Sequence, residues 1–98
     1  MPVFNFQGKL WLYKGHAAWH FITLPKAISA QIKQLFLGME RGWGSLPVKV
    51  IIGKSEWQTS IFPDRKTKSY LLPIKAGIRK KENLKVEDKV KVSLEILV

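Results

Sequence analysis

The sequence predicts a small, mainly β domain. About six strands form a single barrel, and two short helices are inserted between them. Apolar and polar residues alternate over several short segments, which is the period of a half-buried strand. A helical spacing occurs in only two stretches, and these two stretches resemble each other. The chain has 98 residues, which suffices for one hydrophobic core, so we expect residues 1–98 to form a single domain.

The amino-terminal segment predicts a β-hairpin. Residues 3–13 alternate, and the apolar residues on one side of this strand are Phe4, Phe6, Leu10 and Leu12. Gly8 interrupts the pattern and predicts a bulge or a bend. A turn at residues 14–16 then leads to a returning strand at residues 18–24.

A helix is predicted next, over residues 25–37. Pro25 suits the first helical position, because its missing N–H would have no partner there, and Gly38 suits the residue just past the end. The apolar residues of this segment share one stripe at i, i+4, i+7 and i+8, and they are Ile28, Ile32, Leu35 and Phe36. We expect this stripe to pack against the barrel.

The middle of the chain predicts three more strands. Residues 38–47 contain three glycines and end in a proline, which predicts a loop. Residues 48–52 form a β-branched strand, and residues 57–62 form the strand that returns from it. Residues 63–66 begin with Pro-Asp, a common start of a turn, and residues 69–72 are extended.

A second helix and a last strand complete the predicted elements. Residues 75–83 form a short basic helix that Gly77 weakens. Apolar residues then alternate cleanly with polar ones, which predicts a strand; they are Val90, Val92, Leu94 and Ile96.

The two helical stretches indicate an internal repeat. Residues 23–35 (TLPKAISAQIKQL) and 71–84 (LLPIKAGIRKKENL) each pass from an extended segment through Leu-Pro into a helix. A constant shift aligns Lys26 with Lys75. The alternative is coincidence, because Leu, Lys and Ala are common residues. A true repeat predicts two strand–helix–strand halves related by a pseudo-twofold axis, and therefore a barrel closed within one chain and a monomer.

Composition and charge exclude several classes of protein. Cysteine is absent, which excludes disulfides, thiolate nucleophiles and Cys metal sites. No apolar run approaches the roughly 20 residues of a membrane span, and the amino end lacks the pattern of a secretory signal. We therefore expect a cytoplasmic protein without membrane attachment. The formal net charge is +10, which permits an acidic partner such as nucleic acid.

Motifs of metal binding and catalysis are also missing. His16 and His20 fall in a predicted turn and strand, where four residues span roughly 13 Å at about 3.3 Å each. That separation is too large for both side chains to bind one metal ion. The sequence has no nucleophile elbow, phosphate-binding loop or dinucleotide-binding motif. We therefore predict no catalytic residue, no metal and no cofactor.

Several segments occur in an order that resembles a known family. They are GKLWLY, GHAAWHFITLP, RGWG, VKVIIGKSEWQTS, SYLLPIKAGIRK and EDKVKVSL. Together they resemble the bacterial domain-of-unknown-function 1905 family over nearly the whole chain. The resemblance implies a double-split β-barrel, related in architecture to AbrB-like regulators and MazE-like antitoxins, with both halves in one chain. It implies no activity and no site residue.

One position departs from the pattern of that family. Its members tend to have Gly-Asp at the turn before the last strand, where this chain has Glu87-Asp88. A left-handed backbone at this turn would be less comfortable for glutamate than for glycine.

The loop around residue 43 is one candidate ligand site. Arg41 and Trp43 lie among glycines, and Trp57 begins a strand after the next turn, so that it could come near them. A flat apolar ring beside a guanidinium is what an aromatic or anionic ligand needs. In the alternative, which we prefer, Trp43 folds back over an open barrel end and buries its ring.

A basic cluster on and around the second helix is the candidate nucleic-acid surface. It consists of Lys75, Arg79, Lys80, Lys81 and Lys85. A basic helix on a barrel can contact phosphates without sequence preference. The alternative, which we prefer, is a solvated face that only keeps the protein soluble.

These observations lead to a functional hypothesis with two alternatives. The leading hypothesis is a noncatalytic binding module for an anionic ligand or partner. The first alternative is nonspecific DNA or RNA binding through the basic helix. The second is a small enzyme that uses the loop from Arg41 to Trp43.

Overall fold

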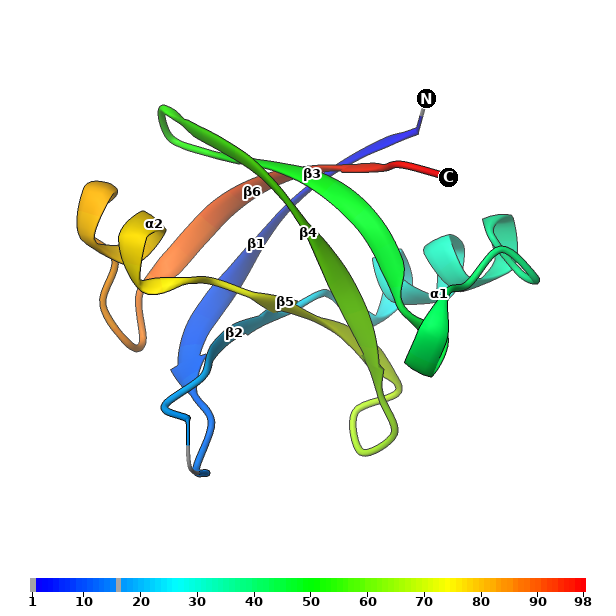
Figure 1. The fold of residues 1–98 in the computed structure, drawn as a ribbon, viewed down its shortest axis with the longest axis horizontal. Helices are drawn as coiled ribbons and strands as arrows, with labels where there is room; N and C mark the ends of the chain where they lie inside the picture. The colour runs from blue at the N-terminus through cyan, green and yellow to red at the C-terminus, as the bar shows by residue number, and fades with distance from the viewer. Residues whose placement is uncertain (1, 16) are drawn as a thin grey trace.

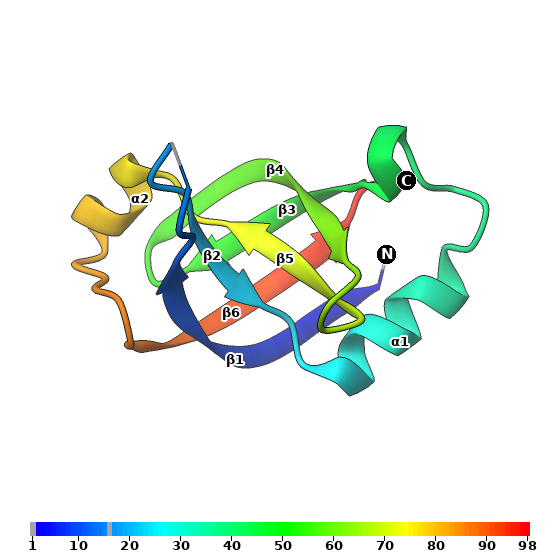
Figure 2. The ribbon, with the colours of Figure 1, turned by 90° about the horizontal axis from the view of Figure 1, so that it is seen from below.

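The computed structural model describes residues 2–15 and 17–98. Within these residues the chain forms six strands, two α-helices and one 3-10 turn: β1 (Val3–Leu12), β2 (His20–Thr23), α1 (Lys26–Leu35), η1 (Gly42–Gly44), β3 (Leu46–Ile52), β4 (Ser55–Asp64), β5 (Ser69–Pro73), α2 (Ala76–Lys81) and β6 (Lys89–Ile96). The strands close an antiparallel barrel in the order β1-β2-β5-β4-β3-β6. The two helices lie at opposite ends of it (Figures 1 and 2). The predicted fold class, mainly β with two short helices, is confirmed.

The two halves of the chain hold equivalent places in this ring. The hairpin β1–β2 is followed by α1 and β3, and the hairpin β4–β5 is followed by α2 and β6. Exchanging β1 with β4, β2 with β5 and β3 with β6 gives the same strand order in the ring, because each neighbouring pair maps onto another neighbouring pair. The topology therefore has the pseudo-twofold symmetry that the internal repeat predicts.

Backbone hydrogen bonds give the spacing of equivalent residues in this symmetry. The Leu24 N–H donates to the Tyr70 carbonyl (2.9 Å), and the Ile74 N–H donates to the His20 carbonyl (2.9 Å). Equivalent residues of β2 and β5 are thus 50 positions apart, since 74 − 24 = 70 − 20 = 50. The sequence alignment that pairs Lys26 with Lys75 is wrong by one residue, because it matches similar letters. The helices themselves begin 50 positions apart, at Lys26 and Ala76.

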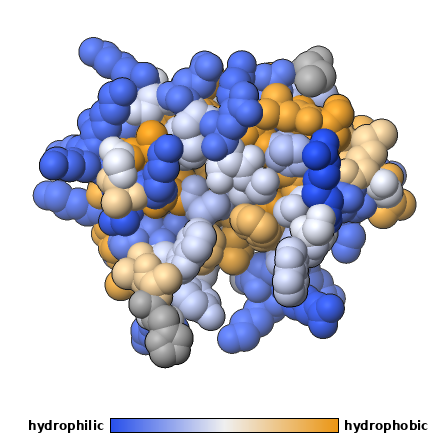
Figure 3. Space-filling model, in the orientation of Figure 1, coloured by the Kyte–Doolittle hydropathy of each residue, from blue (hydrophilic) through white to orange (hydrophobic). Residues whose placement is uncertain are grey.

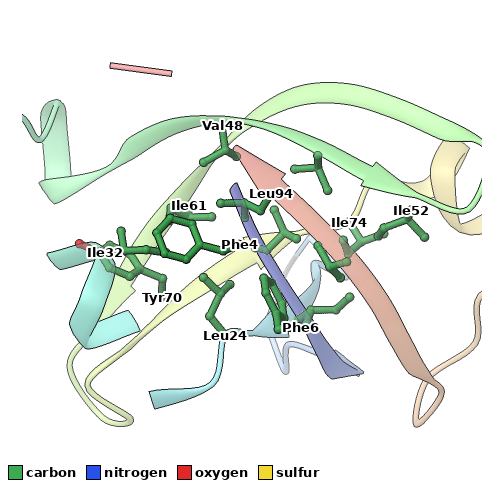
Figure 4. Close-up of a cluster of buried hydrophobic side chains, with 14 of the residues drawn as sticks. Phe4, Phe6, Leu24, Ile32, Val48, Ile52, Ile61, Tyr70, Ile74 and Leu94 are labelled. Atoms are coloured by element: carbon green, nitrogen blue, oxygen red, sulfur yellow. The ribbon is translucent and has the colours of Figure 1, made fainter. Parts of the chain in front are cut away.

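The barrel interior is the hydrophobic core. Alternate residues of every strand point inward, and the strand residues without exposed surface are Leu10, Ile22, Leu46, Val48, Val50, Ile61, Leu72, Leu94 and Ile96. Figure 4 shows side chains from both halves of the chain meeting in this interior. Burial of this apolar surface is the main force that closes the ring.

The first strand differs from its predicted form in two places. Its pairing with β6 passes through Gly8 and Val90 without a bulge. Gly8 is needed for another reason: a Cβ at this position would collide with the Ile22 side chain of β2. Leu12 is exposed although Leu10 is buried, because the end of the β1–β2 hairpin extends beyond the barrel (Figure 1).

The helix α1 covers one end of the barrel. Its buried line runs through Ser29, Ile32 and Phe36, so Leu35 lies to the side of that line and is 55% exposed. The prediction that Leu35 faces the core is therefore wrong. Pro25 precedes the helix with an extended backbone (ψ 144°) and does not occupy the first helical position.

A buried hydrogen bond joins α1 to the barrel. The Tyr70 N–H points toward the edge of β5 that pairs with β2, but the pairing with β2 ends at Leu71. The Tyr70 N–H donates instead to the Ser29 hydroxyl (3.0 Å). The Ser29 side chain thus replaces a strand as the acceptor for this buried donor. Burial raises the pKa of the Tyr70 phenol above its ordinary value, and the nearby Glu40 carboxylate raises it further.

Two turns of the second half can be compared with their predictions. Pro63 and Asp64 belong to β4 and pair with β5, so the predicted turn at residues 63–66 begins later. Pro63 fits in the strand because it lies beyond Ile61, the last β4 residue that pairs with β3. Glu87 has a positive φ of 81°, so this turn has the left-handed backbone that the family resemblance implies for it.

Candidate functional site

The predicted ligand residues do not meet in the structure. Arg41 and Trp43 lie at the 3-10 turn before β3, whose first residue pairs with Ile61. Trp57 pairs with Val50, roughly 13 Å further along β4 at about 3.3 Å per residue. The Trp43 side chain is 94% exposed, so the interpretation that its ring is buried over the barrel end is also wrong.

The predicted basic cluster divides into two groups. Lys75 and Arg79 line a groove at the start of α2, and Trp57 lines the same groove. Lys80, Lys81 and Lys85 are exposed and are not among the residues that line it. The structure therefore combines one residue of the predicted ligand site with two residues of the predicted nucleic-acid surface.

We call this hollow the cationic groove. It has a volume of about 370 Å³ and lies between β2, β4 and the segment that joins β5 to α2. The residues that matter for its chemistry are Trp19, His20, Trp57, Ile74, Lys75 and Arg79. Because the Ile74 N–H bonds to the His20 carbonyl (2.9 Å), the barrel itself holds the β2 and α2 walls together.

Two polar side chains of the groove have a defined orientation. The Arg79 Nε donates to the Ile74 carbonyl (3.2 Å), so the terminal nitrogens of the guanidinium are the donors that a ligand can meet. The His20 Nδ1 lies 2.9 Å from the Ala18 carbonyl. A carbonyl only accepts, so this nitrogen carries the hydrogen, and Nε2 is the acceptor of the neutral ring.

Aromatic rings form the apolar part of the groove. Trp57 is half-buried and packs against the core, while Trp19 is 49% exposed. No acidic residue is among the described residues that line the groove. Two acidic side chains elsewhere are engaged within the chain: Glu82 accepts from the Ser55 hydroxyl (2.6 Å), and Glu95 pairs with Lys49 (3.3 Å). The described lining of the groove therefore carries two cations, Lys75 and Arg79, and no carboxylate.

Comparison with known families identifies the chain. The family model of a domain of unknown function, DUF1905, matches residues 6–94. The chain belongs to the DUF1905 family. A search of the curated proteins found no match. In this DUF1905 domain the matched region begins in β1 and ends in β6, so all elements that build the cationic groove lie inside it.

Of the helices in the described residues, neither has the length and apolar character needed to cross a membrane.

Sequence reasoning misses two residues of the cationic groove in this DUF1905 domain. The sequence places Trp19 only in a returning strand. It considers His20 for a metal site with His16 and rejects that site, and His16 lies outside the described residues. The available signal is a pair of aromatic residues near the predicted turn: Tyr13 precedes the turn and Trp19 follows it. That signal does not tell which side chains of β2 approach α2, because this depends on how β2 pairs with β5.

Proposed function

We propose that this DUF1905 domain is a noncatalytic binding module for a small anionic ligand that also carries a flat apolar group. The observation that supports this most directly is the arrangement of Arg79 and Lys75 beside Trp57 and Trp19 in one groove, with no carboxylate among its described lining residues. The volume of about 370 Å³ falls in the range of small-molecule sites.

The chemistry of the groove favours a carboxylate or phosphate attached to an aromatic ring. The guanidinium of Arg79 offers a planar set of donors, which suits two oxygens of one anion. Its bond to the Ile74 carbonyl holds it in place, so little side-chain entropy is lost on binding. The indole faces supply apolar area for a ring.

Titration with phenyl phosphate and with inorganic phosphate tests this proposal. We expect both to shift the amide resonances of His20, Lys75 and Arg79 in NMR spectra of the whole chain. Phenyl phosphate should bind more tightly, because its ring adds apolar contact with the indoles. Equal affinity of the two ions, or shifts spread over all surface lysines, would contradict the proposal.

A matched pair of variants on α2 gives the sharper measurement. Arg79→Gln should weaken phenyl phosphate binding about tenfold, since a hydrogen bond to a charged group is worth about 1.5–3 kcal/mol. Lys80→Gln removes the same charge from the next residue but outside the groove, and it should change the affinity less than about twofold, because exposed charges are screened. If both variants lose affinity equally, total charge and not the groove binds the anion.

A further inference from the structure

A second hollow lies between the ends of the two hairpins. Its volume is about 1000 Å³. Figure 1 shows the two loops that project from the same side of the barrel, and Figure 3 shows the surface hollowed between them. We call it the aromatic groove. Its floor includes Phe21 of β2 and Leu71 of β5, the central strands of the pseudo-twofold. Its walls are therefore equivalent parts of the two halves of the chain.

The β1–β2 wall of the aromatic groove is a cluster of aromatic rings around Phe21. The Trp19 and Phe21 rings are stacked, with centroids 5.9 Å apart and planes 10° apart. The Tyr13 ring meets the Phe21 ring edge-on, with centroids 6.2 Å apart. The centroid of the Trp11 ring lies 5.4 Å from that of Phe21. The Trp11 indole N–H also donates to the Thr23 hydroxyl (2.9 Å). The rings hold one another in place, yet Tyr13 and Trp19 are each 49% exposed.

The β4–β5 wall of the aromatic groove carries positive charge. Arg65 and Lys66 lie in its turn and are exposed, and Lys14 adds a cation from the opposite wall. The one acidic residue among the described lining residues is Asp64. Its carboxylate is used within the turn, where it accepts from the Thr67 hydroxyl (2.9 Å) and the Lys66 N–H (3.4 Å). The β1–β2 wall thus carries the aromatic rings and Lys14, and the β4–β5 wall carries two cations, Arg65 and Lys66, beside the Asp64 carboxylate.

We propose that the aromatic groove binds single-stranded nucleic acid. Unpaired bases stack on the exposed faces of the ring cluster, and the phosphates between them lie along Arg65, Lys66 and Lys14. Stacking on aromatic side chains beside a cationic track is the general mode of single-strand binding. A duplex presents no free base faces to the rings, so its binding depends on charge alone.

Charge argues against a second copy of this chain as the occupant. Two copies joined through the aromatic groove would bring two sets of the same three cations together, and the chain as a whole carries a net charge of +10. Like charges placed opposite each other at an interface are strongly unfavourable. An acidic protein would satisfy the cations and is the competing occupant that the experiment below tests.

This inference goes beyond the proposed function and rests on different residues. Of the residues that the structure describes, only Trp19 lines both grooves; Arg65, Lys66 and Tyr13 do not line the cationic groove. Binding of phenyl phosphate and binding of a single strand can therefore fail independently. Arg79→Gln should leave single-strand affinity within about twofold of wild type, because Arg79 does not line the aromatic groove.

Fluorescence anisotropy with a short labelled oligothymidylate tests the stacking contact. Tyr13→Ala should weaken binding about tenfold, since one base–aromatic stack is worth about 1–3 kcal/mol. Trp43→Ala is the matched control, because the Trp43 ring is 94% exposed but lies at η1 and does not line the aromatic groove. Equal losses in the two variants would overturn the proposal.

The salt dependence of the same measurement tests the phosphate contact. Arg65→Gln should reduce the slope of log affinity against log salt by about 0.7, the contribution of one phosphate contact to a single strand. Lys54→Gln removes one exposed cation from the β3–β4 turn and should leave the slope unchanged. An unchanged slope for Arg65→Gln, equal affinity for a duplex of the same length, or equally tight binding of polyglutamate would each overturn the proposal.

Discussion

The helices α1 and α2 occupy equivalent places in the two halves of the chain, but they use those places differently. α1 has ten residues and buries Ser29 and Ile32 within its length. α2 has six residues, buries only Ile78 and ends in three consecutive basic residues. α1 therefore closes one end of the barrel, whereas α2 holds one side chain in the core and presents Arg79 to the cationic groove.

The polar contacts of the two helices show the same difference. In α1 the Ser29 hydroxyl satisfies a buried backbone donor of β5. At α2 the polar contacts are only partly buried: Glu82, just after the helix, accepts from Ser55, and Arg79 donates to the Ile74 carbonyl. The comparison teaches that the ring of strands creates two similar positions, and that side chains decide which one becomes core and which becomes binding surface.

Truncation of the central isoleucine of each helix should give the largest effect and the clearest contrast. Ile32 is 0% exposed and Ile78 is 7% exposed. Ile32→Ala should lower the free energy of unfolding by about 4 kcal/mol and Ile78→Ala by about 2 kcal/mol, within the usual range for such cavities. Urea unfolding measures both. A larger loss for Ile78→Ala would show that α2, and not α1, is the tighter seal.

The two buried serines should give an intermediate effect. Ser29→Ala leaves the buried Tyr70 N–H without its acceptor and should cost about 2 kcal/mol. Ser55→Ala removes a donor from the Glu82 carboxylate, which is only half-buried and can turn toward water, so it should cost less than about 1 kcal/mol. Equal losses in the free energy of unfolding, measured by chemical denaturation, would mean that the two serine hydrogen bonds are equally buried.

The turns that follow the two helices should give the smallest effect. Gly38 has a φ of 85° with open space where a Cβ would lie, and Asn83 has a φ of 54°. Gly38→Ala should cost about 1 kcal/mol, because a side chain is strained in the left-handed region. Asn83→Gly should change stability by less than about 0.5 kcal/mol, since asparagine tolerates this region. Thermal unfolding compares the two variants, and a larger loss for Asn83→Gly would contradict this order.

Local patterns account for most of the fold. The alternation in residues 3–13 and 90–96, and the helical stripe after Pro25, each depend on residues close together in the sequence. Those elements agree with the structure apart from their ends. The errors at Leu12 and Pro63 share one cause: each residue lies where a strand passes the edge of the barrel, and the position of that edge is a tertiary property. Leu35 is exposed because it lies beside the line of α1 that faces the barrel, and the packing of the helix decides which line that is.

The grooves are less accessible to sequence reasoning than the fold. The sequence marks both Trp57 and Arg79 as candidates, but it assigns them to separate sites with different ligands. Their common groove arises because β4 neighbours β5 and β5 leads into α2. No spacing in the sequence contains that information, since the two residues belong to different elements of a closed ring.

By itself, the sequence determined the fold class, the two-part repeat and the excess of positive charge, because periodicity and composition are properties of short segments and of the whole chain. Only the tertiary structure decided which aromatic rings stand beside which cations. Closing the barrel brings the ends of the two hairpins together and places α2 against β2. The contacts that form there join residues about 50 positions apart, such as His20 and Ile74, and depend on strand pairing that no local pattern specifies.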